Sequence, residues 1–233
     1  MWIVIPVKRF SNAKTRLSNT LSAAERESLA QVMLHDVLQA ASEACLVSGI
    51  VVVSNEVRSR YAVERVGGLY IEESGSGLSG AIRQAADWLT SHGQRGLMML
   101  PGDVPLVSSR EIDRIVEQHS GSPAVSLAPD REHDGTNALA VTPADAIPFS
   151  FGRESFSRHK QAAEAAGIKP VVHDMSGLAL DIDTPMDVQT LLTYDSETES
   201  LAYLTDSGIA RRVLHRHNAD SEINGKTAGS RPL

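Results

Sequence analysis

Strand-like and helix-like segments alternate along most of the chain, and this alternation limits the folds open to it. Short apolar runs rich in β-branched or aliphatic residues occur at residues 2–6, 50–54, 68–71, 97–100, 124–127, 138–141, 170–173 and 178–181. Helical patterns occur from about Ser22 onward and near residues 56–66, 78–91, 109–119, 155–166 and 185–192. The alternation predicts an α/β fold, a mostly parallel sheet with helices on both faces. Ligands of such folds bind at the carboxyl ends of the strands.

Two helix starts carry specific signals. Ser22 is a typical N-cap residue, and Glu25 follows it at the spacing of a capping box. Thr184 is a second N-cap, with Pro185 at the first helical position. The length of 233 residues suits one large domain, which we place at residues 1–194. Residues 195–233 form a polar C-terminal extension that we expect to be partly mobile.

Composition disfavours several classes of function. The net charge of −7 and the aromatic content of 4% argue against binding to nucleic acid, whose phosphates attract basic faces and whose bases stack on aromatic rings. No apolar run is long enough to cross a bilayer, and the N-terminus lacks the features of a signal peptide. We therefore expect a cytoplasmic protein that binds no membrane. Cys45 is the only cysteine, which excludes an internal disulfide and a zinc-ligand cluster of cysteines.

The loop that follows the first strand is basic. It contains Lys8, Arg9, Lys14 and Arg16, at a place where α/β proteins bind the phosphates of nucleotides. The loop has no glycine, so it is neither a P-loop nor a dinucleotide-binding fingerprint, and an ATPase or a dehydrogenase is disfavoured. The alternative is a solvated basic loop without a ligand.

Three aspartates follow predicted strands. Asp103 lies between two prolines after the strand at 97–100, and Asp181 and Asp183 belong to the segment LALDIDTP. In an extended segment residues two apart project to the same side, so Asp181 and Asp183 face one way while Ile182 faces inward. Like charges held this close favour a bound cation, and carboxylate oxygens suit Mg²⁺. The alternatives are a turn residue for Asp103 and a charge at a helix N-terminus for Asp183.

Several motifs occur together in a recognisable order. The succession IPVK, AKTRLS, GLSGAI, LPGDVPL, DGTNAL, FGRESFSRH and LALDIDTP resembles the 2-phospho-L-lactate guanylyltransferase family of coenzyme F(420) biosynthesis, over roughly residues 1–192. The family includes branches that act on phosphoenolpyruvate or 3-phospho-D-glycerate. The resemblance implies a three-layer nucleotidyltransferase fold of the sugar-nucleotide transferase type. It also implies transfer of GMP from GTP to a phosphorylated three-carbon acid, with release of pyrophosphate and delivery of the product to a deazaflavin transferase.

The resemblance also assigns roles to individual positions. The Mg²⁺ ligands are expected to be Asp103, Asp181 and Asp183. The catalytic residues that hold the triphosphate are expected to be Lys8, Lys14 and Arg16, together with Asp103. The acceptor acid is expected at Thr136, Gly152 and Ser155, and the nucleotide at Ser54, Gly77 and Ser79. Ser79 stands where the family is expected to favour asparagine. Ser155 begins a predicted helix, whose free amides favour an anion.

Two other functions remain open at this stage. Another nucleotidyltransferase of the same fold, acting on a sugar phosphate or on molybdopterin, is the first, although a glycine-rich first loop would be expected for it. The second is a non-catalytic GTP sensor, for which three carboxylates around one site would be costly without a metal. His159 and His173 are weaker candidates for contact with the acceptor, since histidines at such places are more often core or surface residues.

Overall fold

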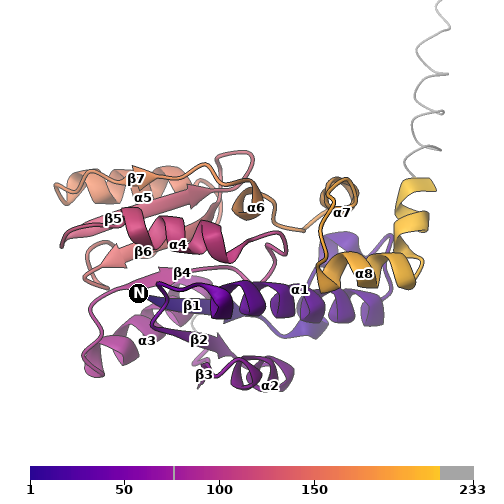
Figure 1. The fold of residues 1–233 in the computed structure, drawn as a ribbon, viewed down its shortest axis with the longest axis horizontal. Helices are drawn as coiled ribbons and strands as arrows, with labels where there is room; N and C mark the ends of the chain where they lie inside the picture. Colours follow the sequence, from indigo (N-terminus) through magenta and orange to yellow (C-terminus); the bar gives the residue numbers. More distant parts are fainter. Residues whose placement is uncertain (76, 216–233) are drawn as a thin grey trace, which may run out of the picture.

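The computed structural model describes residues 1–75 and 77–215 and contains one seven-stranded sheet (Figure 1). The strands are β1 (Trp2–Val7), β2 (Gly49–Ser54), β3 (Leu69–Glu72), β4 (Leu97–Met99), β5 (Ala124–Pro129), β6 (Thr136–Thr142) and β7 (Val171–Val172). Their order in the sheet is β3-β2-β1-β4-β6-β5-β7. β6 runs antiparallel to its neighbours β4 and β5, and the other pairs are parallel. The predicted mostly parallel α/β sheet is confirmed.

The described part of the chain contains α-helices and two 3₁₀ turns, and its residues 209–215 are helical in addition to the elements named below. The α-helices are α1 (Ala23–Glu43), α2 (Val57–Arg65), α3 (Gly77–Ser91), α4 (Ser109–Gln118), α5 (Ser155–Ala165), α6 (Ser176–Ala179), α7 (Pro185–Leu191) and α8 (Glu199–Asp206). The turns η1 (Phe10–Asn12) and η2 (Thr15–Leu17) follow β1. Both predicted N-caps are confirmed, because Ser22 and Thr184 each form a complete capping box.

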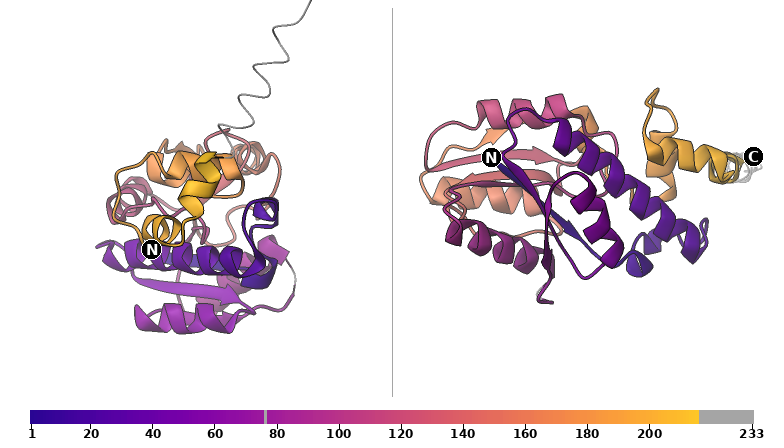
Figure 2. Two further views of the ribbon diagram at one scale, coloured as in Figure 1. Left: turned by 90° about the vertical axis from the view of Figure 1, so that its right-hand side faces the viewer. Right: turned by 60° about the horizontal axis from the view of Figure 1, so that its bottom comes forward.

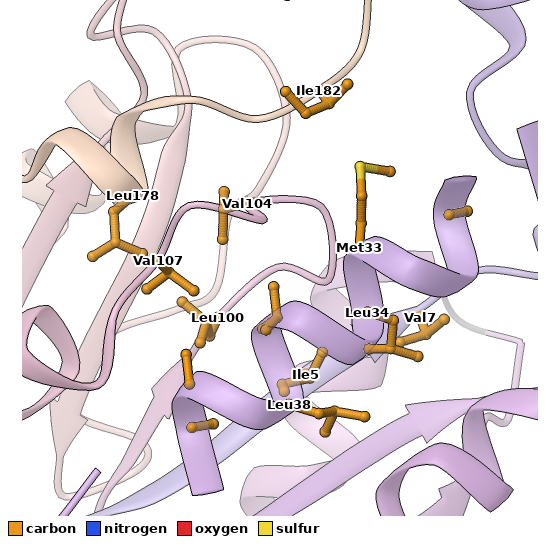
Figure 3. Close-up of a cluster of buried hydrophobic side chains, with 14 of the residues drawn as sticks. Ile5, Val7, Met33, Leu34, Leu38, Leu100, Val104, Val107, Leu178 and Ile182 are labelled. Atoms are coloured by element: carbon orange, nitrogen blue, oxygen red, sulfur yellow. The ribbon is translucent and has the colours of Figure 1, made fainter. Parts of the chain in front are cut away.

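Two apolar layers cover the two faces of the sheet. Along β1, Ile3 and Ile5 pack into one layer, while Val4 packs into the other, as the period of a strand requires. The first layer is closed by α1, α2 and α4, and the second by α3 and α5. Figure 3 shows the first layer, where Met33, Leu34 and Leu38 of α1 lie near β1 and the segment after β4. This layer holds the loops after β1 and β4 in place beside each other.

The strand predicted at residues 178–181 is wrong. Residues 176–179 form α6, and residues 180–184 have no regular structure. Leu178 and Ile182 are buried in the first layer, which explains the strand-like alternation of apolar side chains. The backbone groups of this segment form hydrogen bonds with other loops and not with a neighbouring strand. Ile182 N–H donates to Asp103 O (3.1 Å), and Leu178 O accepts from Asn137 Nδ2 (2.8 Å).

The segment after α7 packs on the rest of the domain. α8 lies against α1 on the side where β1 and its parallel neighbours end (Figures 1 and 2). Leu204, Ile209 and Val213 are buried in the first apolar layer. The division at residue 195 stays a prediction, and residues 216–233 of the predicted extension lie outside the described residues. None of the helices in the described ranges is long and apolar enough to span a membrane.

Candidate active site

A cavity of about 990 Å³ lies at the carboxyl ends of β1 and β4. Its lining comes from the loops after β1 and β4, from the β3–α3, β5–β6 and β6–α5 connections, and from the segment between α6 and α7. Ten of the twelve predicted site residues line this cavity: Lys8, Lys14, Arg16, Gly77, Asp103, Thr136, Gly152, Ser155, Asp181 and Asp183. The fold therefore brings together residues that are up to 175 positions apart, Lys8 and Asp183.

Lys14 lies at the centre of the carboxylate cluster. Its Nζ is 2.6 Å from Asp103 Oδ2 and 2.9 Å from Asp183 Oδ1, and only 6% of its side chain is exposed. Burial lowers the pKa of Lys14, but the charges of Asp103 and Asp183 outweigh it, so the net pKa is raised. Lys14 also has a left-handed backbone with φ of 53°, a conformation that costs energy for a residue with a side chain. The ion pairs therefore hold a strained turn.

Arg16 and Lys8 lie further out than Lys14. Arg16 Nη1 is 3.7 Å from Asp183 Oδ2, and the Arg16 side chain is 73% exposed. Burial raises the pKa of Asp183, but Lys14, Arg16 and Lys8 together bring it below its ordinary value. Both outer side chains are exposed, so they are free to meet a ligand that enters the cavity.

Asp181 differs from the other two aspartates because no cation balances it in the described residues. Its pKa is raised to about 6, first by burial and then by the negative charge of Asp103. Its side-chain partner is Asn137, whose Nδ2 donates to Oδ1 at 3.3 Å. The cluster thus holds three carboxylates against one buried lysine and one exposed arginine.

The donor chemistry of this cluster fits Mg²⁺, which prefers carboxylate oxygens. Asp181 supplies the carboxylate whose charge is unbalanced. The three aspartates are not yet arranged as a ligand set, however, since Lys14 Nζ lies between Asp103 and Asp183. Throughout residues 1–75 and 77–215, no group of three or more His, Cys, Asp or Glu side chains is placed to hold a metal ion. Mg²⁺ binding here stays a prediction.

The opposite wall of the cavity is built around the start of α5. Gly152 has φ of 110°, which only glycine adopts readily. Ser155 is 1% exposed and opens the helix. Asp134 fixes this turn, because its Oδ1 accepts from Glu154 N–H (3.1 Å) and its carbonyl accepts from Phe156 N–H (3.1 Å). Thr136, at the start of β6, completes this wall of the cavity.

Comparison with known proteins decides the family. The family model described as guanylyl transferase CofC like matches residues 1–226. The chain belongs to this family. It is 36% identical over 188 residues to the phosphoenolpyruvate guanylyltransferase of Sphaerobacter thermophilus, covering 81% of this chain and 90% of that one. It is 34% identical over 202 residues to the 2-phospho-L-lactate guanylyltransferase of Methanothermobacter thermautotrophicus, covering 86% and 88%. The resemblance inferred from the motifs is confirmed.

Solved structures agree with the nucleotidyltransferase fold. A crystal structure from Desulfovibrio desulfuricans G20 superposes with a TM-score of 0.73 at 14% identity, covering 91% of this chain and 97% of that one. A nucleotidyl transferase from Methanothermobacter thermautotrophicus superposes with a TM-score of 0.60 at 16% identity, covering 82% and 94%. At such identities these likenesses bear on the fold alone, and they confirm the predicted fold class of this guanylyltransferase family member.

Two predicted nucleotide-binding residues do not line the cavity of this CofC-like protein. Ser54 is fully buried, and its Oγ donates to Val7 O (2.6 Å) and accepts from Glu56 N–H (2.9 Å). Ser79 Oγ accepts from Phe151 N–H at 3.2 Å. Both hydroxyls therefore serve hydrogen bonds within the protein. A strand end and a motif position place a residue near the cavity but do not show where its side chain points.

Asn137 is the cavity residue that the sequence reasoning missed. It is 7% exposed, and its Nδ2 links Leu178 O to the Asp181 carboxylate. The signal in the sequence is the side-chain amide of Asn137, which stands next to Thr136 at the start of a predicted strand. An amide that is buried there needs a polar partner. The two weaker histidine candidates, His159 and His173, are both buried and do not line the cavity.

Proposed function

We propose that this protein transfers GMP from GTP to a phosphorylated three-carbon acid and releases pyrophosphate, in the biosynthesis of coenzyme F(420). The acid is 2-phospho-L-lactate, phosphoenolpyruvate or 3-phospho-D-glycerate. The observation that carries the proposal is one cavity with two different walls: the cluster of Lys14, Asp103, Asp181 and Asp183, and the start of α5. The names of the relatives, phosphoenolpyruvate and 2-phospho-L-lactate guanylyltransferase, support the same reaction.

The chemistry needs little from the protein beyond charge and position. An oxygen of the acceptor's phosphate attacks the α-phosphorus of GTP, a new P–O bond forms, and the bond to the β-phosphate breaks to release pyrophosphate. The attacking phosphate is already ionised at neutral pH, so no general base is required. Holding the two reactants in line in one cavity supplies much of the rate.

The aspartate cluster and the basic loop suit the triphosphate. Lys8 and Arg16 are exposed on the cavity wall, where a flexible cation and a bidentate guanidinium neutralise phosphate oxygens. Asp103, Asp181 and Asp183 would hold Mg²⁺, which when bound supplies positive charge to the phosphates and the leaving pyrophosphate. Gly77 lines the same cavity and is the remaining candidate contact to the nucleotide.

The wall at α5 suits the acid. The N-terminus of α5 is the positive end of the helix dipole, which favours an anion, although the backbone N–H groups of Ser155 and Phe156 already donate to Gly152 O and Asp134 O. Ser155 and Thr136 add hydroxyl groups. A three-carbon acid with one phosphate and one carboxylate has two anionic ends, which matches a cavity with two separate places for negative charge. We expect the product to pass to a deazaflavin transferase, and both steps to occur in the cytoplasm.

The experiment is a direct assay of the three acids. Purified protein is incubated with GTP, Mg²⁺ and one acid at a time, and pyrophosphate release and the guanylylated product are measured. We expect release with at least one acid and its loss in Asp103→Ala, whereas Asp195→Ala, an exposed change outside the cavity, keeps it. Release with a sugar phosphate but none of the acids would overturn the acceptor. Tight GTP binding without any turnover would favour a sensor.

A further inference from the structure

His159 lies directly behind the wall that we assign to the acid. It stands on α5 four residues after Ser155, so the two side chains share one face of the helix. His159 is 0% exposed and does not line the cavity. Its ring packs edge-on against Phe151, with centroids 4.7 Å apart. A histidine in this place touches the cavity only through its neighbours.

The hydrogen bonds of His159 define which ring nitrogen carries the proton. The backbone N–H of Ser150 donates to Nε2 at 2.9 Å. A backbone N–H can only donate, so Nε2 must be the unprotonated nitrogen of a neutral ring. Burial, followed by the charge of Arg158, lowers the pKa of His159 to about 4, so the ring is neutral near pH 7. The proton is therefore on Nδ1.

The partner of Nδ1 is the hydroxyl of Thr136. Nδ1 lies 3.1 Å from Thr136 Oγ1, and with the proton on Nδ1 the hydroxyl oxygen accepts this hydrogen bond. Thr136 keeps its own hydroxyl proton, which must point away from His159. Thr136 is 7% exposed and lines the cavity, and within the described ranges its hydroxyl has no side-chain partner besides His159. Because Thr136 lines the cavity, a ligand bound there can accept this proton.

We propose that His159 is a positioning residue, which fixes the Thr136 hydroxyl as a hydrogen-bond donor to an anionic group of the acceptor acid. The inference rests on the proposed function, which already places the Thr136 hydroxyl at the acid, and adds to it the residue that orients this hydroxyl. A hydroxyl without this partner would rotate and could present a lone pair to the acid instead of its proton. The neutral His159 ring orients the Thr136 hydroxyl and adds no charge to the site.

Two pairs of variants test whether His159 acts through its hydrogen bond to the Thr136 hydroxyl. Thr136→Val removes the hydroxyl and keeps the backbone amide and the shape, whereas Thr136→Ser keeps a hydroxyl. His159→Asn places its amide nitrogen near the position of Nδ1, whereas His159→Gln reaches the position of Nε2 and loses the donor to Thr136. Steady-state assays with GTP, Mg²⁺ and the acid that supports turnover give KM for the acid and for GTP separately.

We expect Thr136→Val and His159→Gln each to raise KM for the acid roughly tenfold or more, as the loss of a hydrogen bond to a charged group predicts. KM for GTP should change by less than about twofold, because neither variant changes a contact to GTP. Thr136→Ser and His159→Asn should stay close to the wild type. The double variant His159→Gln/Thr136→Val should equal Thr136→Val alone, because His159 acts only through the hydroxyl.

Several results would overturn the inference. A double variant whose effects simply multiply would show that His159 acts on something else. Thr136→Val with an unchanged KM would remove the hydroxyl from the site. The tautomer is measured in the wild type by ¹⁵N NMR of labelled histidine, without any activity and without a variant that must fold; a proton on Nε2 would contradict the proposal. A wild type that turns over none of the acids fails the proposed function itself and takes this inference with it.

Discussion

Lys14 Nζ lies 2.6 Å from Asp103 Oδ2, a contact that joins the loop after β1 to the loop after β4. The two residues are 89 positions apart, and the parallel pairing of β1 with β4 brings them together. The same ammonium also contacts Asp183. Lys14 thus occupies the space between two of the three carboxylates expected to bind Mg²⁺. To hold the triphosphate, as the sequence predicts, Lys14 must leave this position.

The position of Lys14 predicts competition between its ammonium and a divalent cation. Lys14→Met removes one positive charge from among three carboxylates, so we expect Mn²⁺, used in place of Mg²⁺ and without nucleotide, to bind roughly tenfold more tightly. The measurement is a titration followed by electron paramagnetic resonance, which reports free Mn²⁺. Lys160→Met, an exposed change outside the cavity, is the control. Weaker binding of Mn²⁺ by Lys14→Met would show that the lysine supports the cation site instead of filling it.

The raised pKa of Asp181 indicates that its carboxylate lowers the stability of the folded protein near neutral pH, while we expect the same carboxylate to be needed for activity. Its pKa is raised from 3.8 to about 6, with burial as the first cause. The folded state therefore binds a proton more tightly than the unfolded state, and stability is lost as pH rises from about 4 to 6. At pH 7.5 without metal, Asp181→Asn should raise the free energy of unfolding by about 3 kcal/mol, with no gain near pH 3. Urea unfolding measures both. The variant should also lose pyrophosphate release; an unchanged stability at pH 7.5 would contradict this account.

Sequence reasoning placed the main elements and most of the site because both depend on local or periodic signals. The capping boxes at Ser22 and Thr184 are local, and the two apolar layers follow the period of each strand. Parallel strands then bring their carboxyl ends to one edge, so the loops that carry Lys14 and Asp103 are predicted to lie near each other. These features need no knowledge of the tertiary structure.

The sequence predicts less where tertiary contacts decide the local structure. The alternation at residues 178–182 suggests a strand, but the backbone there pairs with Asp103 and Asn137 across the cavity. Ser54 sits at a strand end, yet its side chain turns back to Val7. The ion pair of Lys14 depends on a left-handed turn, which no residue type in that loop signals. Side-chain direction in irregular segments is set by partners far away in the sequence.

Hydrogen bonds to the Asp36 side chain hold the start of α8 on α1. Its carboxylate accepts from the backbone N–H groups of Glu199 (2.7 Å) and Ser200 (3.0 Å), where α8 begins. Asp36→Ala leaves these donors without their partner, and we expect a loss of about 1 to 3 kcal/mol in the stability of this segment. Hydrogen exchange should speed up at residues 199–206. Asp113→Ala, which removes a similar acceptor from Cys45 and Leu46, is the control and should leave that exchange unchanged. Equal exchange in both variants would contradict the role of Asp36.

His159 gives a prediction for acid stability. Burial, with the charge of Arg158 second, lowers its pKa in the folded state to about 4, against an ordinary value of 6.5. Between these two values the unfolded chain binds the proton and the folded protein does not. The contribution of the neutral ring is therefore complete above about pH 6.5 and is lost as pH falls toward 4, by about 3 kcal/mol in all.

Urea unfolding of the wild type and of His159→Asn at pH 7.5 and pH 4.5 isolates this contribution, because the other histidines, His119 and His173 included, titrate in both proteins and cancel in the difference. The wild type should lose about 2 to 3 kcal/mol more than the variant over this range. Equal losses in the two proteins would mean that His159 is protonated in the folded state at pH 4.5, and the hydrogen bond from Ser150 to Nε2 would then have to break.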